Sequence, residues 1–210
     1  MSELVVRTAT GVVMILVALF ATIAGGYAFA VLAAAAATAV FYEWTRLTKG
    51  WGPAWYISGF VYALAAALSL LWVRERAGNG IGLVLWVFIV VWATDIGAYF
   101  IGRAIGGPKL APAISPGKTW AGFYGGIAAA TLFGGAWALF VDLNPTVLLL
   151  APLFSVASQG GDLFESRMKR LAGVKDSGRW LPGHGGVFDR LDGLLPVVIL
   201  TAVAVIAGAA

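Results

Sequence analysis

Apolar residues fill this chain in long runs, which are interrupted by short turns and by two polar stretches. A helix needs about 20 mostly apolar residues to cross a bilayer. The sequence offers about seven such runs, or six if the crowded first pair is one span. The first two share residues 12–41 and are divided by a turn at Gly25–Gly26, and the others cover about 53–73, 81–102, 119–141, 145–164 and 194–209. The pattern predicts an all-α, polytopic integral membrane protein.

The first apolar run has a second interpretation. Arg7, the run from Val12 and the triplet Ala28–Phe29–Ala30 resemble a cleaved signal peptide. A second apolar run follows at once, which favours a helical hairpin.

Composition supports a membrane protein and narrows its chemistry. Hydrophobic residues make up 60% and charged residues 11% of the 210 residues, against about 25% charged in soluble domains. Abundant glycine and alanine suit close helix packing in lipid and are compatible with a homodimer. The absence of cysteine excludes thiolate metal sites and a cysteine nucleophile. With a single histidine, a metal site must use carboxylates, which favours Mg²⁺ over zinc.

The basic residues indicate how the chain is oriented. With seven spans and a cytoplasmic N-terminus, Arg74 and Arg76 lie outside and the other 12 of the 14 basic residues lie inside, as the positive-inside rule requires. The 12 are Arg7, Arg46, Lys49, Arg103, Lys109, Lys118, Arg167, Lys169, Arg170, Lys175, Arg179 and Arg190. We therefore expect a multi-pass protein of the inner cell membrane. N-terminal transmembrane helices would occupy residues 1–80, and a candidate catalytic region would occupy 81–210 with cytoplasmic loops at 103–118 and 166–192.

The stretch 161–192 is the most polar part of the chain. It holds six basic side chains, five acidic ones and the only histidine. Charged groups are costly at a membrane, so such a stretch is a functional-site candidate. Asp162, Glu165, Ser166 and Lys169 share one helical face, since they lie three or four residues apart.

Two aspartates can meet where the runs on either side of this stretch enter the membrane. Asp162 ends one run, and Asp189 precedes the next by a few residues. Two carboxylates in a poorly solvated pocket repel each other unless a proton or a cation lies between them. Alternatively, each aspartate forms an ion pair with a local Arg or Lys. The nearby cations Lys169, Arg170 and Lys175 exceed what helix ends need, which favours a site for a cation and a phosphate.

Glycine-rich turns add anion-binding groups to the same stretch. The run from Pro182 through His184, Gly185 and Gly186 can turn sharply and present N–H groups to an anion. His184 would either contact a phosphate or form hydrogen bonds within the loop. The sequence DRLD, residues 189–192, places alternating charges, among them Arg190, directly against the last apolar run.

The other polar loop contains Ser115, Gly117, Lys118 and Thr119. This GKT triplet is not a P-loop, because Pro112 replaces the first glycine and no strand precedes it. We expect a rigid turn that holds Lys118 and hydroxyl groups, Ser115 among them, near a phosphate. The alternative is a lysine that reaches lipid headgroups.

Two further acids lie inside apolar runs. Asp95 lies well within the fourth run, where a carboxylate is costly unless it is paired or hydrated. It either completes the polar site or pairs with a buried cation or hydroxyl. Glu43, three residues before Arg46, is expected to form an interfacial ion pair with it.

The stretch 166–192 resembles the signature of phosphatidate cytidylyltransferases, the CDP-diacylglycerol synthases, without departure. The matching positions are Ser166, Met168, Lys169, Arg170, Lys175, Asp176, Gly178, Leu181, Pro182, His184, Gly185, Gly186, Val187, Asp189, Arg190, Leu191 and Asp192. Residues 94–99, 109–112 and 115–120 also resemble bacterial members. The resemblance covers about residues 86–210, and residues 1–80 are similar only in being hydrophobic.

This resemblance implies that CTP and phosphatidic acid give CDP-diacylglycerol and pyrophosphate with Mg²⁺, and it leaves a second cation open. It implies that Asp162 and Asp189 bind metal and that the basic residues of the signature hold phosphates. From this we expect Lys169, Arg170, Lys175 and Lys118 to clamp phosphates, with Asp192 and Asp95 as auxiliary metal ligands. The remaining substrate-binding candidates are Ser115, Ser166, Asp176, His184, Gly185, Gly186, Arg190 and Asp95. The expected partners are CTP, phosphatidic acid and the bilayer, without nucleic acid.

Two other functions compete with cytidylyl transfer. A CTP-dependent kinase of a lipid alcohol, like the polyprenol kinases, would release CDP and could use Asp95 as a base. A cation-coupled transporter would carry acids in several spans, whereas the charges here cluster at one face.

Overall fold

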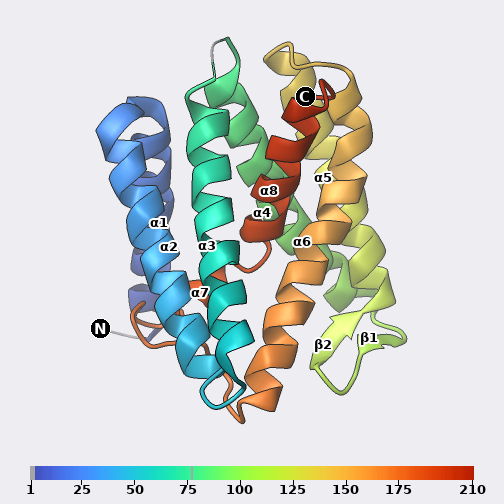
Figure 1. Ribbon diagram of the computed structural model, residues 1–210. Helices are drawn as coiled ribbons and strands as arrows, with labels where there is room; N and C mark the ends of the chain where they lie inside the picture. Colours follow the sequence, from blue (N-terminus) through green and yellow to red (C-terminus); the bar gives the residue numbers. More distant parts are fainter. Residues whose placement is uncertain (1–2, 77) are drawn as a thin grey trace.

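Seven apolar helices stand side by side in the computed structural model, which describes residues 3–76 and 78–210 (Figure 1). They are α1 (Glu3–Ala24), α2 (Gly26–Leu47), α3 (Pro53–Arg74), α4 (Gly80–Ile105), α5 (Trp120–Phe140), α6 (Thr146–Leu171) and α8 (Leu194–Ile206), and the single turn α7 (Phe188–Leu191) precedes the last. Within the described residues, α1 to α6 are long and apolar enough to cross a bilayer, and α8 is shorter. The predicted all-α, polytopic membrane fold is confirmed.

The helix boundaries follow local chemistry. Gly25 and Gly26 have φ angles of +65° and +51°, which most L residues avoid, so α1 and α2 are separated at the predicted turn. Helix α6 continues to Leu171, beyond the apolar run that was predicted to end at Phe164. Its last turn carries Lys169 and Arg170, and positive charge stabilises a helix carboxyl end. The loop predicted from residue 166 therefore begins only after Leu171.

The loop predicted over 103–118 is also more regular than expected. Helix α4 extends to Ile105, and strands β1 (Lys109–Ala111) and β2 (Ser115–Thr119) form an antiparallel hairpin. An isolated two-stranded hairpin is marginally stable, but this one is joined directly to α5. The Oγ1 of Thr119 accepts a hydrogen bond from the N–H of Gly122 at 3.1 Å and so caps that helix.

Helices α4 and α5 approach each other closely because glycines line their contact. A Cβ at Gly97 would lie 2.8 Å from the carbonyl oxygen of Gly125, and one at Gly122 would lie 2.7 Å from that of Ala98. Side chains at these positions would push the two backbones apart, so the close pair depends on small residues, as is usual in membranes. This pair carries the hairpin at one end.

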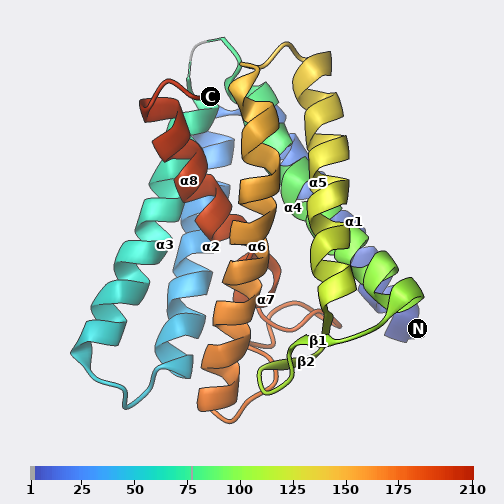
Figure 2. The same ribbon diagram turned by 90° about the vertical axis from the view of Figure 1, so that its right-hand side faces the viewer.

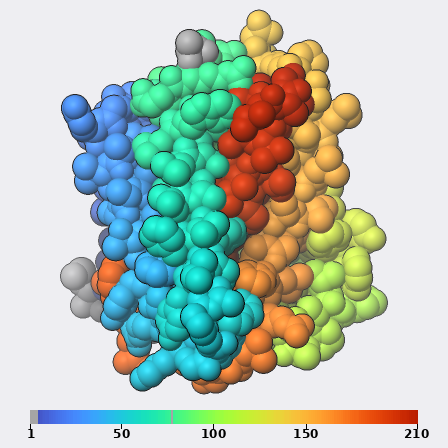
Figure 3. Space-filling view, viewed as in Figure 1, coloured from blue at the N-terminus to red at the C-terminus, as the bar shows by residue number. Residues whose placement is uncertain are grey.

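The polar segments gather at one end of the bundle, together with the N-terminal end of α1 (Figures 1 and 2). We call this the polar end; it carries the hairpin, residues 109–119, and the glycine-rich loop, residues 172–187. The C-terminus lies at the opposite end. In the space-filling view, α8 covers only the upper half of the face between α3 and α6 (Figure 3). The division into regions 1–80 and 81–210 stays a prediction.

Candidate active site

Lys169, near the end of α6, joins two acidic residues at the polar end. Its Nζ forms an ion pair with Glu165, one turn earlier, and lies 2.6 Å from Oδ1 of Asp189. Glu165 is fully buried, and Asp189 is 5% exposed. One lysine therefore serves two acidic side chains.

Asp189 also holds the glycine-rich loop in place. Its Oδ2 accepts hydrogen bonds from the backbone N–H of Ser177 at 2.9 Å and of Gly186 at 2.8 Å. Burial alone would raise the pKa of the Asp189 carboxyl, but the hydrogen bonds from Lys169 and Gly186 hold that pKa below its usual value. Because it donates to the Asp189 carboxylate, the Gly186 N–H is already engaged within the protein and is not free to bind a substrate anion.

Glu43 of α2 is a site residue, and its predicted ion pair was wrong. The expected ion pair with Arg46 does not form; the Arg46 guanidinium lies over the Tyr42 ring. Glu43 is fully buried, and its Oε2 accepts hydrogen bonds from the Ser177 hydroxyl and the Phe188 N–H, both at 2.8 Å.

The glycine-rich loop is shaped to receive this carboxylate. Oε1 of Glu43 accepts from the Val187 N–H at 3.1 Å. A Cβ at Gly178 would lie 2.1 Å from Oε1, and one at Gly186 would lie 2.4 Å from Oε2. The loop therefore needs glycine at both positions. Nothing in the sequence near Glu43 signals this contact, because its partners lie more than 130 positions later.

The hairpin meets α6 through Lys118 and Asp162. Lys118 Nζ lies 2.6 Å from Asp162 Oδ2, and the Ser166 hydroxyl donates to Asp162 Oδ1 at 3.2 Å. The two charged side chains are 24% and 34% exposed, so water and solutes can reach them. Lys118 thus pairs with an acidic residue of the site, and a solute could take the place of Asp162 in this pair.

Asp192 and Asp95 place two more carboxyl groups beside this pair. Asp192 is half-buried, with its Oδ1 accepting from the Gly193 N–H at 2.8 Å. Burial, together with the negative charges of Asp162 and Asp95, raises the pKa of Asp192 to about 8. Asp95 is exposed on α4, and within the described chain it forms neither a hydrogen bond nor an ion pair. The structural pairing considered for Asp95 is therefore not observed.

Two predicted phosphate-binding arginines contact backbone oxygens. Arg170 donates from Nε to the carbonyl of Ile114 at 3.1 Å, which ties α6 to the hairpin. Arg190 donates from Nε to the carbonyl of His184 at 3.1 Å. Both side chains are exposed, so these contacts leave guanidinium N–H groups available to a ligand.

The remaining candidates lie around the rim of the site. Lys175 and Asp176 are exposed and have no side-chain hydrogen bond or ion pair in residues 3–76 and 78–210. His184 lies against α1, with Nε2 facing Gly11, and its Nδ1 is 3.4 Å from the Pro182 carbonyl. Ser115 is half-buried in β2, and Gly185 turns the loop with a φ of +84°. Their predicted substrate contacts stay predictions.

The carboxylates fit a divalent cation only together with other ligands. In the described part of the chain, no three acidic or histidine side chains are grouped closely enough to hold a metal ion alone. Mg²⁺ is usually bound by one or two carboxylates, with substrate phosphates and water completing its shell. Asp162 and Asp192 fit that pattern, because adjacent negative charges favour a bound cation. Asp189 already accepts three hydrogen bonds of the about four that a carboxylate can take.

Comparison with known proteins identifies the chain's family. The model of the cytidylyltransferase family matches residues 49–207. A phosphatidate cytidylyltransferase of Brucella suis is 40% identical, over 95% of this chain and 92% of that protein. One of Staphylococcus epidermidis is 45% identical, over 63% of this chain and 52% of that protein.

These matches confirm the resemblance seen in the signature and correct its extent. An alignment over 95% of the chain includes most of residues 1–80, which were expected to be similar only in hydrophobicity. The helix that carries Glu43 thus lies within the family resemblance. The chain belongs to the cytidylyltransferase family and is a nucleotidyltransferase.

Proposed function

We propose that this enzyme transfers the cytidylyl group of CTP to phosphatidic acid, giving CDP-diacylglycerol and pyrophosphate in phospholipid biosynthesis. The observation that carries the proposal is the accessible Lys118–Asp162 pair, beside the Lys169–Asp189 cluster, in a chain of this family. It joins a cation for phosphate to a carboxylate for a metal.

The reaction needs charge neutralisation more than proton transfer. A phosphate oxygen of phosphatidic acid, already an anion, bonds to the α-phosphorus of CTP, and the bond from that phosphorus to the bridging oxygen of the β-phosphate breaks. The electron pair leaves with pyrophosphate. Two anions must therefore approach each other, and positioned cations lower that barrier.

We assign this task to the basic residues around the site. Lys118 would exchange Asp162 for a phosphate oxygen, since their pair is partly exposed. Arg170 and Lys175 would bind phosphates with exposed groups, with Arg190 and His184 contributing from the loop. Ser115, Ser166 and Asp176 would contact substrates at the rim. Lys169, held in place by its ion pair with Asp189, would add positive charge to the site.

The carboxylates would hold Mg²⁺ together with the substrates. When bound, Mg²⁺ supplies positive charge that stabilises the leaving pyrophosphate. Asp162 and Asp192 are the residues best placed to hold it, with Asp95 nearby. Asp189 could add its remaining acceptor position, and its hydrogen bonds would support the site in either case. A second cation remains part of the proposal.

The polar end would face the cytoplasm at the inner membrane. CTP would then enter from water while the lipid tails remain in the bilayer. The distribution of 12 basic residues against two supports this orientation.

The test uses two differently labelled CTP samples with purified enzyme, phosphatidic acid and Mg²⁺. Label at the α-phosphorus should enter the lipid, and label at the γ-phosphorus should appear in pyrophosphate. Transfer of γ-label to a lipid alcohol would instead identify a kinase and overturn the proposal. Asp162→Asn serves as the inactive control.

A further inference from the structure

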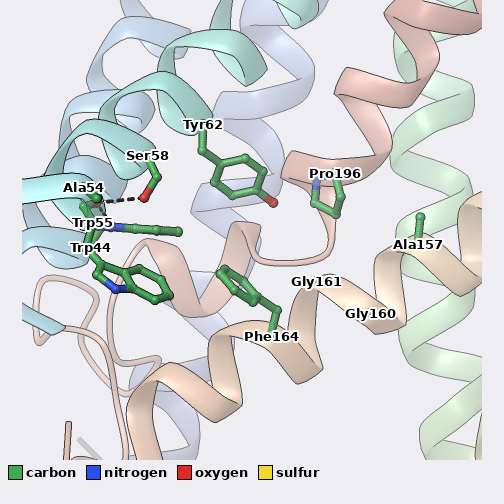
Figure 4. Close-up of a pocket in the computed structure, with 10 residues that line it drawn as sticks. All are labelled: Trp44, Ala54, Trp55, Ser58, Tyr62, Ala157, Gly160, Gly161, Phe164 and Pro196. Carbon is green, nitrogen blue, oxygen red and sulfur yellow. Dashed lines mark hydrogen bonds between the residues drawn. The ribbon is translucent and has the colours of Figure 1, made fainter. Parts of the chain in front are cut away.

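An apolar groove lies below α8, between α3 and α6, with a cavity volume of about 700 Å³ (Figure 4). It exists because α8 is short. With 13 residues and about 1.5 Å per residue, α8 is roughly 20 Å long, which is less than the bilayer core of about 30 Å. Pro196, in the first turn of α8, forms the upper edge of the groove. Below it, the facing parts of α3 and α6 have no helix between them.

The groove walls suit hydrocarbon. Aromatic rings of Trp44, Trp55, Tyr62 and Phe164 form one side, as Figure 4 shows. The Trp44 indole N–H donates to the Trp55 carbonyl at 2.8 Å, so it does not offer a polar contact to a ligand. A nucleotide would find few partners here, whereas an alkyl chain can pack against the rings.

The groove adjoins the backbone of Asp192, one of the proposed metal ligands. Its lining includes Gly160 and Gly161 of α6. Gly161 packs so closely on the start of α8 that a Cβ there would lie 2.2 Å from the Asp192 carbonyl oxygen. At Gly160, by contrast, a Cβ would meet nothing within 4 Å. This glycine therefore keeps the groove open and is not required by helix packing.

We propose that the groove binds an acyl chain of the phosphatidic acid substrate, an inference that rests on the proposed function. The lipid phosphate would then lie at the end of the groove that adjoins Asp192. Because the chain moves from one hydrocarbon environment to another, the groove gains little from the hydrophobic effect. Its effect is to position the phosphate for attack.

The first test fills the groove with a side chain. Gly160→Leu should lower kcat/KM for dipalmitoyl phosphatidic acid at least tenfold and leave that for water-soluble dihexanoyl phosphatidic acid within about twofold, because short chains need less of the groove. Ser58→Leu, from the α3 wall, should act in the same direction. Leu153→Phe adds bulk on α6 at a side chain that is 62% exposed and outside the groove, so it should change neither value. Equal losses on both substrates, or no loss, would overturn the inference.

The second test measures binding without turnover. Phosphatidic acid with a photoreactive group on its acyl chain should label Tyr62 or Phe164 in the wild type, and Gly160→Leu should reduce the labelling at least fivefold. Equal labelling by phosphatidylcholine of the same design would mean bulk lipid, and no labelling is expected if a second copy covers the groove; either result overturns the inference. Specific labelling without turnover of any phosphatidic acid would refute the proposed function and leave the groove assignment standing.

Discussion

The glycine-rich loop and the hairpin meet at the same end of the bundle, yet they are held there by different kinds of contact. The loop is pinned by two carboxylates, Glu43 and Asp189, which have almost no exposed surface. The hairpin reaches α6 through the Lys118–Asp162 pair and the bond from Arg170 to the Ile114 carbonyl. Buried polar networks are costly to disrupt, whereas exposed ion pairs contribute about 0–1 kcal/mol.

The two kinds of contact therefore have different roles. The buried loop contacts support the site, and the accessible hairpin contacts can be exchanged for substrate contacts. The loop contacts cannot be traded for substrate contacts without leaving buried donors unpaired, so the loop is a fixed support for Lys169. The hairpin contacts are accessible and weak, so substrate phosphates can replace them. Substitutions at the loop should therefore reduce both stability and activity, and those at the hairpin should reduce activity alone.

The largest effect is expected for Glu43→Ala. Three donors, the Ser177 hydroxyl and the N–H groups of Val187 and Phe188, would lose their acceptor. At about 1–3 kcal/mol for each unpaired buried group, we expect a loss of about 3 kcal/mol or more. Tm should fall by roughly 6–12 °C for a chain of this size, and activity should fall below about 1%.

Glu75→Ala is the matched control for this prediction. Glu75 is exposed and directly follows α3, at the end of the bundle opposite the polar end (Figure 1). Tm and activity should therefore stay near the wild-type values. Glu43→Gln retains one acceptor oxygen and should be intermediate. A Glu43→Ala protein with normal Tm and normal turnover would show that the loop does not depend on this carboxylate.

A pair of aspartate substitutions tests the comparison most directly. Asp162→Asn should lower turnover about a thousandfold but shift Tm by less than about 2 °C, since its contacts are accessible. Asp189→Asn should lower both turnover and Tm, because the mostly buried Lys169 loses a charged partner. Thermal unfolding and cytidylyl transfer, measured on both variants, should separate them. Equal destabilisation of the two variants would mean that the loop and hairpin contacts do not differ in their contribution to stability.

A smaller effect is expected for Lys118→Met. The apolar side chain cannot bind a phosphate, so kcat/KM for CTP should fall about 10–100-fold while Tm remains within about 2 °C. Lys109→Met is the control from the same hairpin, because Lys109 is exposed and should change kcat/KM by less than twofold. The two variants behaving alike would mean that general positive charge, and not Lys118, matters.

The smallest effect is expected for Arg170→Lys. Charge is retained, but the Nε bond to the Ile114 carbonyl is lost, and such a bond contributes about 0.5–1.5 kcal/mol. Turnover should fall about three- to tenfold as the hairpin loosens. Arg179→Lys, at an exposed loop position, should have no effect, and an equal loss there would argue against a role for the hairpin contact.

Much of the fold follows from local patterns. Apolar runs predict helices because every backbone polar group must be satisfied inside a bilayer, and α3, α4, α5 and α8 begin within a residue or two of the predicted positions. Where the pattern fails, the cause is also local. Helix α6 continues beyond its apolar run because its last turns are polar and charged, and hydropathy does not register a polar helix end.

The membrane class, the approximate spans and, through the signature, the family can all be predicted from the amino-acid sequence alone. The assembly of the site became visible only in three dimensions: Glu43 holds the glycine-rich loop, Lys118 reaches Asp162, and a short α8 leaves a groove between α3 and α6. These depend on contacts between residues far apart in the chain. Periodicity encodes which face of a helix is apolar, but not which distant group will meet a buried carboxylate.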